Sequence, residues 1–248
     1  MRATAFAAAC ILGASVSGAA LAADLIVLTN QGATPGVKEL ATAFAKKSGH
    51  KVTVIQAEDA ELKQRLNAGT ADLITGNPGP IDQLVKDGKV VGNTVTPFVL
   101  AGLGLSVRAG APKPDISTVD AFKQTLLNAK SITYLKEGAS TIHLRKVFDQ
   151  LGITEAIKAK AVETQGEQVS EFVAEGKVEL GLIVIPNIMS VPGAEVVGPL
   201  PAAINSIIMF TAAVSTQTPN QQAARELIKL MKSPEAKPVI KAKGNDPA

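Results

Sequence analysis

Two hydrophobic patterns alternate along the chain. Short apolar runs, bounded by polar residues or by Gly and Pro, predict buried strands. They cover residues 25–28, 52–55, 73–74, 99–107, 132–135, 180–185, 195–197 and 207–214. Between them, apolar residues recur at the i, i+3, i+4, i+7 spacing of an amphipathic helix, as in Val37, Leu40, Ala41, Phe44 and again in Leu144, Val147, Phe148, Leu151. The alternation predicts an α/β fold with βαβ units and a largely parallel sheet.

Residues that start and stop helices agree with these positions. Thr34-Pro35 and Thr218-Pro219 each combine an N-cap residue type with a proline suited to the first helical position. Glycines stand where the helical patterns end. They are Gly49, Gly69, Gly152 and Gly176.

The chain divides into two similar halves. The segments "LNAGTADLIT" (66–75) and "VAEGKVELGL" (173–182) both run from a helix through a glycine and an acidic residue to an apolar strand. A Gly/Pro-rich connector at 109–114 and a second crossing near 202–206 predict lobe 1 at 23–108 and 207–248 and lobe 2 at 109–206. We expect two Rossmann-like α/β lobes joined by a two-strand hinge, with strand-to-helix loops lining the cleft.

The first 22 residues have the pattern of a secretory signal peptide. Arg2 precedes an apolar run, and an A-x-A site ends at Ala22. Cys10 lies inside that run with too little hydrophobic sequence before it to favour a lipoprotein. We therefore expect a periplasmic protein cleaved near Ala22, with no cysteine left for a disulfide.

Composition argues against several classes of function. Lys and Arg number 25 against 22 Asp and Glu, and they form no basic stripe, so nucleic acid is not an expected partner. No P-loop or GxSxG motif occurs, and "GLGLSV" (102–107) lies in a strand and lacks the third glycine of a dinucleotide motif. One tyrosine and no tryptophan make a large carbohydrate a weak candidate.

The candidates for catalysis are few. His50 and His143 are the only histidines, and neither has a partner at metal-ligand spacing. His50 suits a solvated position after a helix, and His143 suits a structural hydrogen bond more than a ligand contact. Ser140, His143 and Asp149 share one helix, which does not aim a hydroxyl at a base that a third group orients. We expect no catalytic residue, metal or cofactor.

Four strand-to-helix loops share one design. They are residues 29–34, 56–61, 138–141 and 164–168. Free N–H groups at helix starts are hydrogen-bond donors backed by the positive end of the helix dipole, so several around one cleft could hold a small polar ligand. For any single loop, ordinary capping by Thr34, Asp59 and Ser140 is the better explanation. Their recurrence favours binding.

The order of segments resembles the type II periplasmic substrate-binding proteins of ABC transporters, most closely the molybdate-binding-protein-like group. The segments that carry the resemblance are "ELATAFAKKSGHKVTV" (39–54), "LNAGTADLI" (66–74), "IDQLVKDGKVV" (81–91), "GAS" with "LRKVFDQLGI" (144–153), "VAEGKVELGL" (173–182) and "AARELIKLMKSPEAKPVIKAKG" (223–244). The resemblance implies a periplasmic-binding-protein type II fold that closes on its ligand by hinge bending.

Within that resemblance, the ligand positions depart from the oxyanion binders. Gly32 stands where they place a serine, Asp59 or Ala60 falls at a second serine, and Val184 stands at a tyrosine. A carboxylate about 4 Å from a dianion costs several kcal/mol at an effective dielectric constant near 20, which argues against molybdate. If Asp59 instead points outward as a cap, backbone N–H groups could still hold an anion.

These observations predict a periplasmic solute-binding protein for ABC-transporter uptake of a molybdate-like oxyanion or another small polar solute. Its expected partners are that solute and an inner-membrane permease with its ATPase, and we expect a monomer. An exported enzyme or a sensory protein on the same fold is the alternative. The expected ligand-lining residues are Asn30, Gln31, Gly32, Ala33, Thr34, Asp59, Ala139, Ser140, Thr141, Gly166, Glu167 and Val184.

Overall fold

The computed structural model describes residues 22–57, 59–165 and 168–248. The expected signal peptide therefore lies outside the described residues, apart from Ala22, and so do Gly166 and Glu167. Within the described ranges, no helix is long and apolar enough to cross a membrane.

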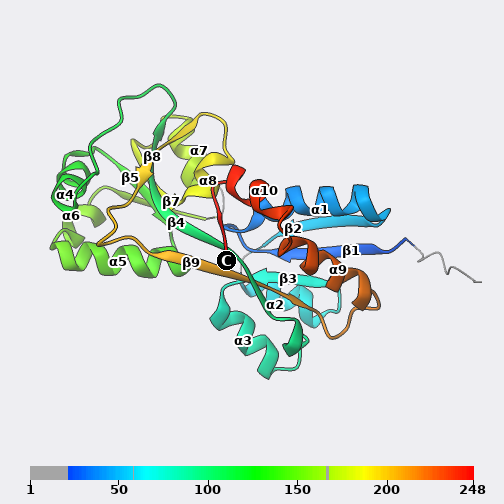
Figure 1. The fold of residues 1–248 in the computed structure, drawn as a ribbon. Coiled ribbons are helices and arrows are strands. Elements are labelled where there is room, and N and C mark those ends of the chain that lie inside the picture. The colour runs from blue at the N-terminus through cyan, green and yellow to red at the C-terminus, as the bar shows by residue number, and fades with distance from the viewer. Residues whose placement is uncertain (1–21, 58, 166–167) are drawn as a thin grey trace, which may run out of the picture.

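One end of the molecule is a three-layer α/β unit built on parallel strands (Figure 1). Its strands are β1 (Asp24–Thr29), β2 (Lys51–Gln56) and β3 (Leu73–Gly76). Its helices include α1 (Thr34–Ser48), α2 (Asp59–Asn67) and α3 (Pro78–Lys86). Strand β1 pairs in parallel with both β2 and β3, so the loops after β1 and β3 leave the sheet at the same edge.

The other end repeats this plan. Its strands are β5 (Ile132–Leu135), β6 (Ala161–Thr164), β7 (Leu180–Val184) and β8 (Ala194–Pro199). Its helices are α4 (Val119–Asn128), α5 (Ala139–Leu151), α6 (Thr154–Lys158), α7 (Gln168–Ala174) and α8 (Ile185–Met189). Strand β5 pairs in parallel with β6 and β7.

Two long strands run between the ends of the molecule. After the short helix η1 (Gly92–Thr94), β4 (Thr96–Arg108) pairs antiparallel with β9 (Ile207–Val214) as far as Gly102 and with β7 from Leu103 onward. Among the described residues the ladder is continuous, in the order β2-β1-β3-β9-β4-β7-β5-β6. The residue bounds of the two lobes stay a prediction.

The C-terminal segment packs back onto the first unit. Helices α9 (Gln221–Met231) and α10 (Ala236–Ala242) both contact α1, and β10 (Asp246–Pro247) pairs with β4. Figure 1 shows α10, in red, beside the blue α1. Segments from the two ends of the chain thus form one layer.

Every strand that the hydrophobic pattern predicts is present, but two expectations about the sheet were wrong. The sheet is mixed, because β9 and β4 run antiparallel to their neighbours at its centre. Strands β6 and β10 were not expected. β6 has two exposed side chains, Val162 and Glu163, between a half-buried and a buried one, and β10 has only two residues, so neither forms an apolar run.

The helix stops are confirmed, whereas both predicted N-caps are wrong. Gly49 and Gly152 are the C-caps of α1 and α5, in the left-handed conformation that glycine adopts without strain. Ala33 is the N-cap of α1, because Thr34 already belongs to the helix, and Asn220 is the N-cap of α9. Thr218 instead donates its hydroxyl to Asp72.

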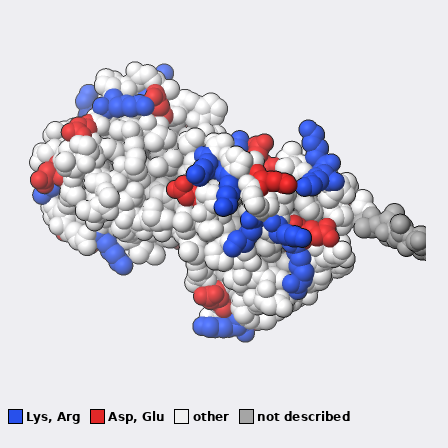
Figure 2. Space-filling view, in the orientation of Figure 1, with Lys and Arg blue, Asp and Glu red and all other residues white. Residues whose placement is uncertain are grey.

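The largest apolar core extends through both ends of the molecule. It joins Phe44 under α1 to Phe122 and Phe148 under α4 and α5, through Leu103 and Leu105 of β4. In the view of Figure 2, Lys and Arg lie interspersed with Asp and Glu, and much of the remaining surface is uncharged.

Candidate functional site

A small cavity of about 70 Å³ lies where loops from both ends of the molecule meet. Its lining comes from the turns after β1, β3, β5 and β7 and from β9. The lining residues are Asn30, Gln31, Gly32, Asn77, Leu135, Glu137, Gly138, Ala139, Ser140, Ile183, Val184, Asn187, Ile208 and Phe210. Strand ends that face each other across two α/β units are the expected position for a ligand in this kind of fold.

The first wall of the cavity is the turn between β1 and α1. The carbonyl of Asn30 accepts hydrogen bonds from the Thr34 hydroxyl at 2.9 Å and from the Ala33 N–H at 3.3 Å. These two bonds point the carbonyl of Asn30 toward the first residues of α1. The side chain of Asn30 lies against that of Asn77, and Asn30 Nδ2 donates to Asn77 Oδ1 at 3.4 Å. In turn, Asn77 Nδ2 donates to the Met209 carbonyl at 3.2 Å.

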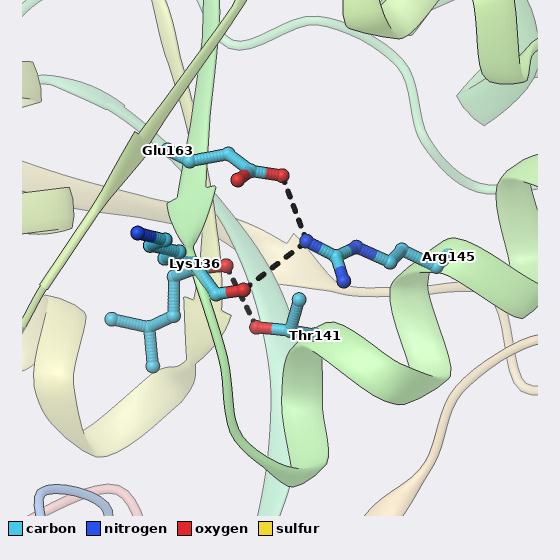
Figure 3. Close-up of polar contacts among 5 residues, drawn as sticks. Lys136, Thr141, Arg145 and Glu163 are labelled. Carbon is cyan, nitrogen blue, oxygen red and sulfur yellow. Dashed lines mark hydrogen bonds and ion pairs between the residues drawn. The ribbon is translucent and has the colours of Figure 1, made fainter. Parts of the chain in front are cut away.

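The facing wall is the turn between β5 and α5 (Figure 3). Thr141 Oγ1 donates to the Leu135 carbonyl at 2.8 Å, and Arg145 Nη2 donates to the Lys136 carbonyl at 3.1 Å and to Glu163 at 2.9 Å. The N-cap is Gly138, whose φ of 113° a side chain would strain. Side chains of α5 thereby hold the loop that leads into the helix start at Ala139 and Ser140.

Backbone dipoles at the start of α5 favour negative charge in the cavity. The first-turn N–H groups of α5 have no acceptor within their helix and are backed by its positive dipole end. Among the described lining residues there is no Lys or Arg, and the one ionisable side chain is the exposed Glu137. Below this wall, burial raises the pKa of Tyr134 and the neighbouring Glu163 raises it further. Apart from the exposed carboxylate of Glu137 the described lining is uncharged, so the helix-start donors suit a small anion or zwitterion.

Two lining amides hold buried acceptors without a partner. Asn187 at the start of α8 is 3% exposed, and its Oδ1 accepts no hydrogen bond from the described residues. The Oδ1 of Asn30 is likewise buried and unbonded. A buried polar atom without a partner costs about 1–3 kcal/mol, so a ligand that donates to these oxygens would recover that cost.

The sequence-predicted residues fall into three groups. Those that the structure brings to the cavity are Asn30, Gln31, Gly32, Ala139, Ser140 and Val184. Ala33, Thr34 and Thr141 are buried in the helix starts behind it, where the two hydroxyls bond to backbone carbonyls. Asp59 is the first residue of α2, and its side chain is not described; Gly166 and Glu167 lie outside the described residues.

Several lining residues were not predicted. Asn77 follows β3 and precedes Pro78, so the same search for strand-to-helix turns would have found it. Asn187 lies three residues after the end of β7, inside the first turn of α8. Phe210 and Ile208 lie in the middle of an apolar strand, and no local signal separates a cavity wall from an ordinary core position.

The histidines have structural contacts. His143 Nε2 lies 2.8 Å from the carbonyl of Ile204, as the structural interpretation of this residue predicted. The solvated position expected for His50 is wrong, because the ring is 9% exposed and accepts a hydrogen bond from the Ala23 N–H at 3.0 Å. Across the described ranges, no group of three or more His, Cys, Asp or Glu could hold a metal ion.

The profile of the bacterial extracellular solute-binding proteins matches residues 25–245. The chain belongs to this family. Among curated relatives of this solute-binding protein is an aconitate isomerase from Pseudomonas sp, 30% identical over 230 residues, which span 90% of this chain and 87% of the relative. The molybdate-binding protein ModA from Azotobacter vinelandii is 28% identical over 236 residues, which span 91% of each chain.

Solved structures share the fold of this solute-binding protein. The periplasmic molybdate-binding protein of Azotobacter vinelandii superposes with a TM-score of 0.75 at 20% identity, over 89% of this chain and 98% of that one. The sulfate-binding protein SubI of Mycobacterium tuberculosis gives 0.71 at 16% identity, over 91% and 87%. The periplasmic-binding-protein type II fold expected from the sequence is therefore confirmed.

Proposed function

We propose that this solute-binding protein captures a small anion, an oxyanion or a carboxylate, in the cavity between its two lobes. The observation that carries the proposal is that the turn before α1 and the start of α5, from opposite ends of the molecule, line the same cavity. Helix N-termini attract negative charge through their free N–H groups and their dipoles. Two relatives are named for negatively charged compounds, aconitate and molybdate, which supports an anionic ligand.

Capture would proceed by closure of the lobes. A ligand shifts the population toward a closed state only through contacts that the open state lacks. Asn30 on one side and Ala139 and Ser140 on the other lie on separate units, so a ligand that touches both favours closure. We further propose that the closed, monomeric protein delivers its solute to an inner-membrane permease with its ATPase, after export to the periplasm.

The test removes one backbone donor from α5 without disturbing the helix. Ala139 is the first residue of α5, where proline is tolerated because that N–H has no helical acceptor. Ala139→Pro should weaken anion binding about tenfold or more, as expected for one lost charge-assisted hydrogen bond. Isothermal titration calorimetry on residues 23–248 would measure it. Ala139→Ser, which keeps the N–H, should bind like the unmodified protein.

Equal affinities of the Pro and Ser variants for every anion that binds would contradict this site. The ligand screen should include molybdate, tungstate, sulfate, phosphate and small carboxylates. Delivery is tested separately, by asking whether the loaded protein stimulates the ATPase of the reconstituted permease. Stimulation of a sensor kinase instead would favour the sensory alternative.

A second candidate is isomerisation of an unsaturated organic acid, favoured by the relative named aconitate isomerase. Moving a carbon–carbon double bond requires a group that takes a proton from one carbon and returns it to another. Glu137 is the one ionisable side chain in the described lining. Chromatography of cis-aconitate and trans-aconitate after incubation would reveal turnover. Activity that Glu137→Gln abolishes would establish the enzyme, and its absence would favour binding alone.

A further inference from the structure

We propose that the cavity selects a small organic acid that carries a hydrogen-bond donor, a hydroxy or amino carboxylate, over tetrahedral inorganic oxyanions. The inference rests on the proposed function, because it names the ligand class of the same site. Three independent features of the lining support it: the space next to Gly32, the apolar wall, and the orientation of the amides.

The space next to Gly32 is already filled by an aromatic ring. A Cβ built on Gly32 would lie 2.4 Å from Cζ of Phe210 and 3.1 Å from its Cε2. Phe210 is 3% exposed and belongs to the apolar core, so moving its ring aside would disturb that packing. A hydroxyl side chain at residue 32, as the resemblance places in oxyanion binders, does not fit beside this ring.

The ring is part of a larger apolar wall. Apolar side chains account for a large share of the lining: Leu135, Ile183, Val184, Ile208 and Phe210. A tetrahedral oxyanion presents charged oxygens in every direction, so contact with this wall would strip water from them without replacing its hydrogen bonds. An organic acid can place its carbon atoms on the wall and its carboxylate at the helix starts.

Two consecutive hydrogen bonds, starting from the Met209 carbonyl, orient the amides of Asn77 and Asn30. The Met209 carbonyl can only accept, so Asn77 must turn its Nδ2 toward it, at 3.2 Å. Asn77 therefore presents Oδ1 to Asn30, which donates from Nδ2 at 3.4 Å. The amide of Asn30 is then left with its Oδ1, a buried acceptor that has no partner among the described residues.

Unpaired acceptors favour a ligand that brings a donor. The Oδ1 of Asn187 is a second such atom, in a side chain that is 3% exposed. Fully ionised sulfate or molybdate has only acceptor atoms and would place them against these oxygens, at the cost of leaving both unpaired. A hydroxyl or ammonium group next to a carboxylate would satisfy them.

The test compares pairs of acids that differ by one donor. Calorimetry on residues 23–248 would measure the affinity for each acid. L-lactate and L-alanine are compared with propionate, and L-malate with succinate. Molybdate, tungstate, sulfate and phosphate are measured in the same way. We expect at least one donor-bearing acid to bind tenfold or more tightly than its partner lacking the donor, and more tightly than every oxyanion. The lactate and alanine arms distinguish a hydroxyl from an ammonium ligand.

Two variants assign the effect to these residues. Asn30→Ala should reduce the preference for the donor-bearing acid at least fivefold, whereas Asn93→Ala, at a polar surface position, should leave it unchanged. The double variant Gly32→Ser with Phe210→Leu should shift the ratio of affinities toward molybdate at least tenfold, because the hydroxyl gains room. Gly79→Ser, at a glycine with nothing within 4 Å, is its matched control.

The outcomes separate this inference from the proposed function. An oxyanion that binds more tightly than every organic acid, through the donor that Ala139→Pro removes, would overturn the ligand class and leave anion capture intact. Equal binding of lactate, alanine and propionate, and of malate and succinate, would overturn the donor argument. No binding of either class would overturn the proposed function itself.

Discussion

The ring of Phe210 occupies the space that a side chain on Gly32 would need. The two residues lie far apart in the sequence, on β9 and on the turn before α1, and the Cβ position of Gly32 is 2.4 Å from Phe210 Cζ. Glycine is therefore required here for close approach, independent of backbone conformation.

Gly32→Ala should destabilise the protein by about 1–3 kcal/mol, the usual cost of overpacking a tightly packed site. Urea unfolding of residues 23–248, followed by circular dichroism, would measure the free energy of unfolding. Phe210→Leu in the same chain should recover part of the loss. Gly79→Ala is the matched control and should cost less than Gly32→Ala, because nothing beyond its own neighbours in the chain lies within 4 Å of its Cβ position.

The buried carboxylate of Asp72 joins β1 to the turn before α9. It accepts from the Ile26 N–H at 2.6 Å, from the Asn220 amide at 3.0 Å and from the Thr218 hydroxyl. Asp72→Ala removes the acceptor of the Ile26 N–H and of the Thr218 hydroxyl, whereas the Asn220 amide keeps the Asp24 carbonyl; the change should lower the free energy of unfolding by about 2–4 kcal/mol. Chemical denaturation measures this. A change as small as that of Glu61→Ala, which breaks an exposed pair with Arg65, would contradict this assignment.

Tyr134 provides a direct probe of the second unit, because it is the only tyrosine and the chain has no tryptophan. Burial, and then Glu163, raise its pKa in the folded protein. The folded state thus keeps the phenol proton at a pH where the unfolded chain has lost it. This contribution to stability is complete below about pH 10 and falls as pH rises through the folded pKa.

Ultraviolet titration of tyrosinate absorbance should therefore show a higher midpoint in the native protein than in guanidinium chloride. Tyr134→Phe should reduce the loss of stability above about pH 10, as measured by urea unfolding at stepped pH values. Equal midpoints in the folded and unfolded states would show that the phenol is solvated.

The hydroxyl of Thr141 holds the cavity loop through the Leu135 carbonyl, at 2.8 Å. Thr141→Val keeps the shape of the side chain and removes the donor, so it should cost about 1 kcal/mol of stability. If the loop positions ligand contacts, affinity in calorimetry should also fall, by about three- to tenfold. Thr42→Val removes a similar bond, from Thr42 to the Lys38 carbonyl within α1, and should leave affinity unchanged.

Local patterns predicted the elements well and their assembly less well. The apolar runs and the Gly stops depend on neighbouring residues alone, which explains why the strands and the ends at Gly49 and Gly152 were found. Hydrophobic spacing does not reveal the direction in which a strand runs, so the antiparallel centre formed by β4 and β9 was not predicted. Both expected N-caps failed because a threonine before proline can equally lie inside a helix or bond elsewhere.

The candidate site shows the same limit. Asn30 and Ser140 were accessible to prediction because each follows a strand and begins a helix. Asn77 is the N-cap of α3 directly after β3 and was missed although the same rule covers it, whereas Asn187 lies inside the first turn of α8. Phe210 could not be found in this way, because a strand residue that faces the core and one that faces a cavity have the same alternating pattern.

The sequence by itself determined the class of fold, the positions of most strands and helices, and membership of the solute-binding family, because these follow from hydrophobic spacing, turn residues and segment order. Only the tertiary structure decided which helix starts converge, that Phe210 fills the space beside Gly32, and that the Met209 carbonyl orients Asn77 and Asn30. These contacts join residues distant in the chain, and their geometry depends on how β9 packs between the two units, which no local pattern specifies.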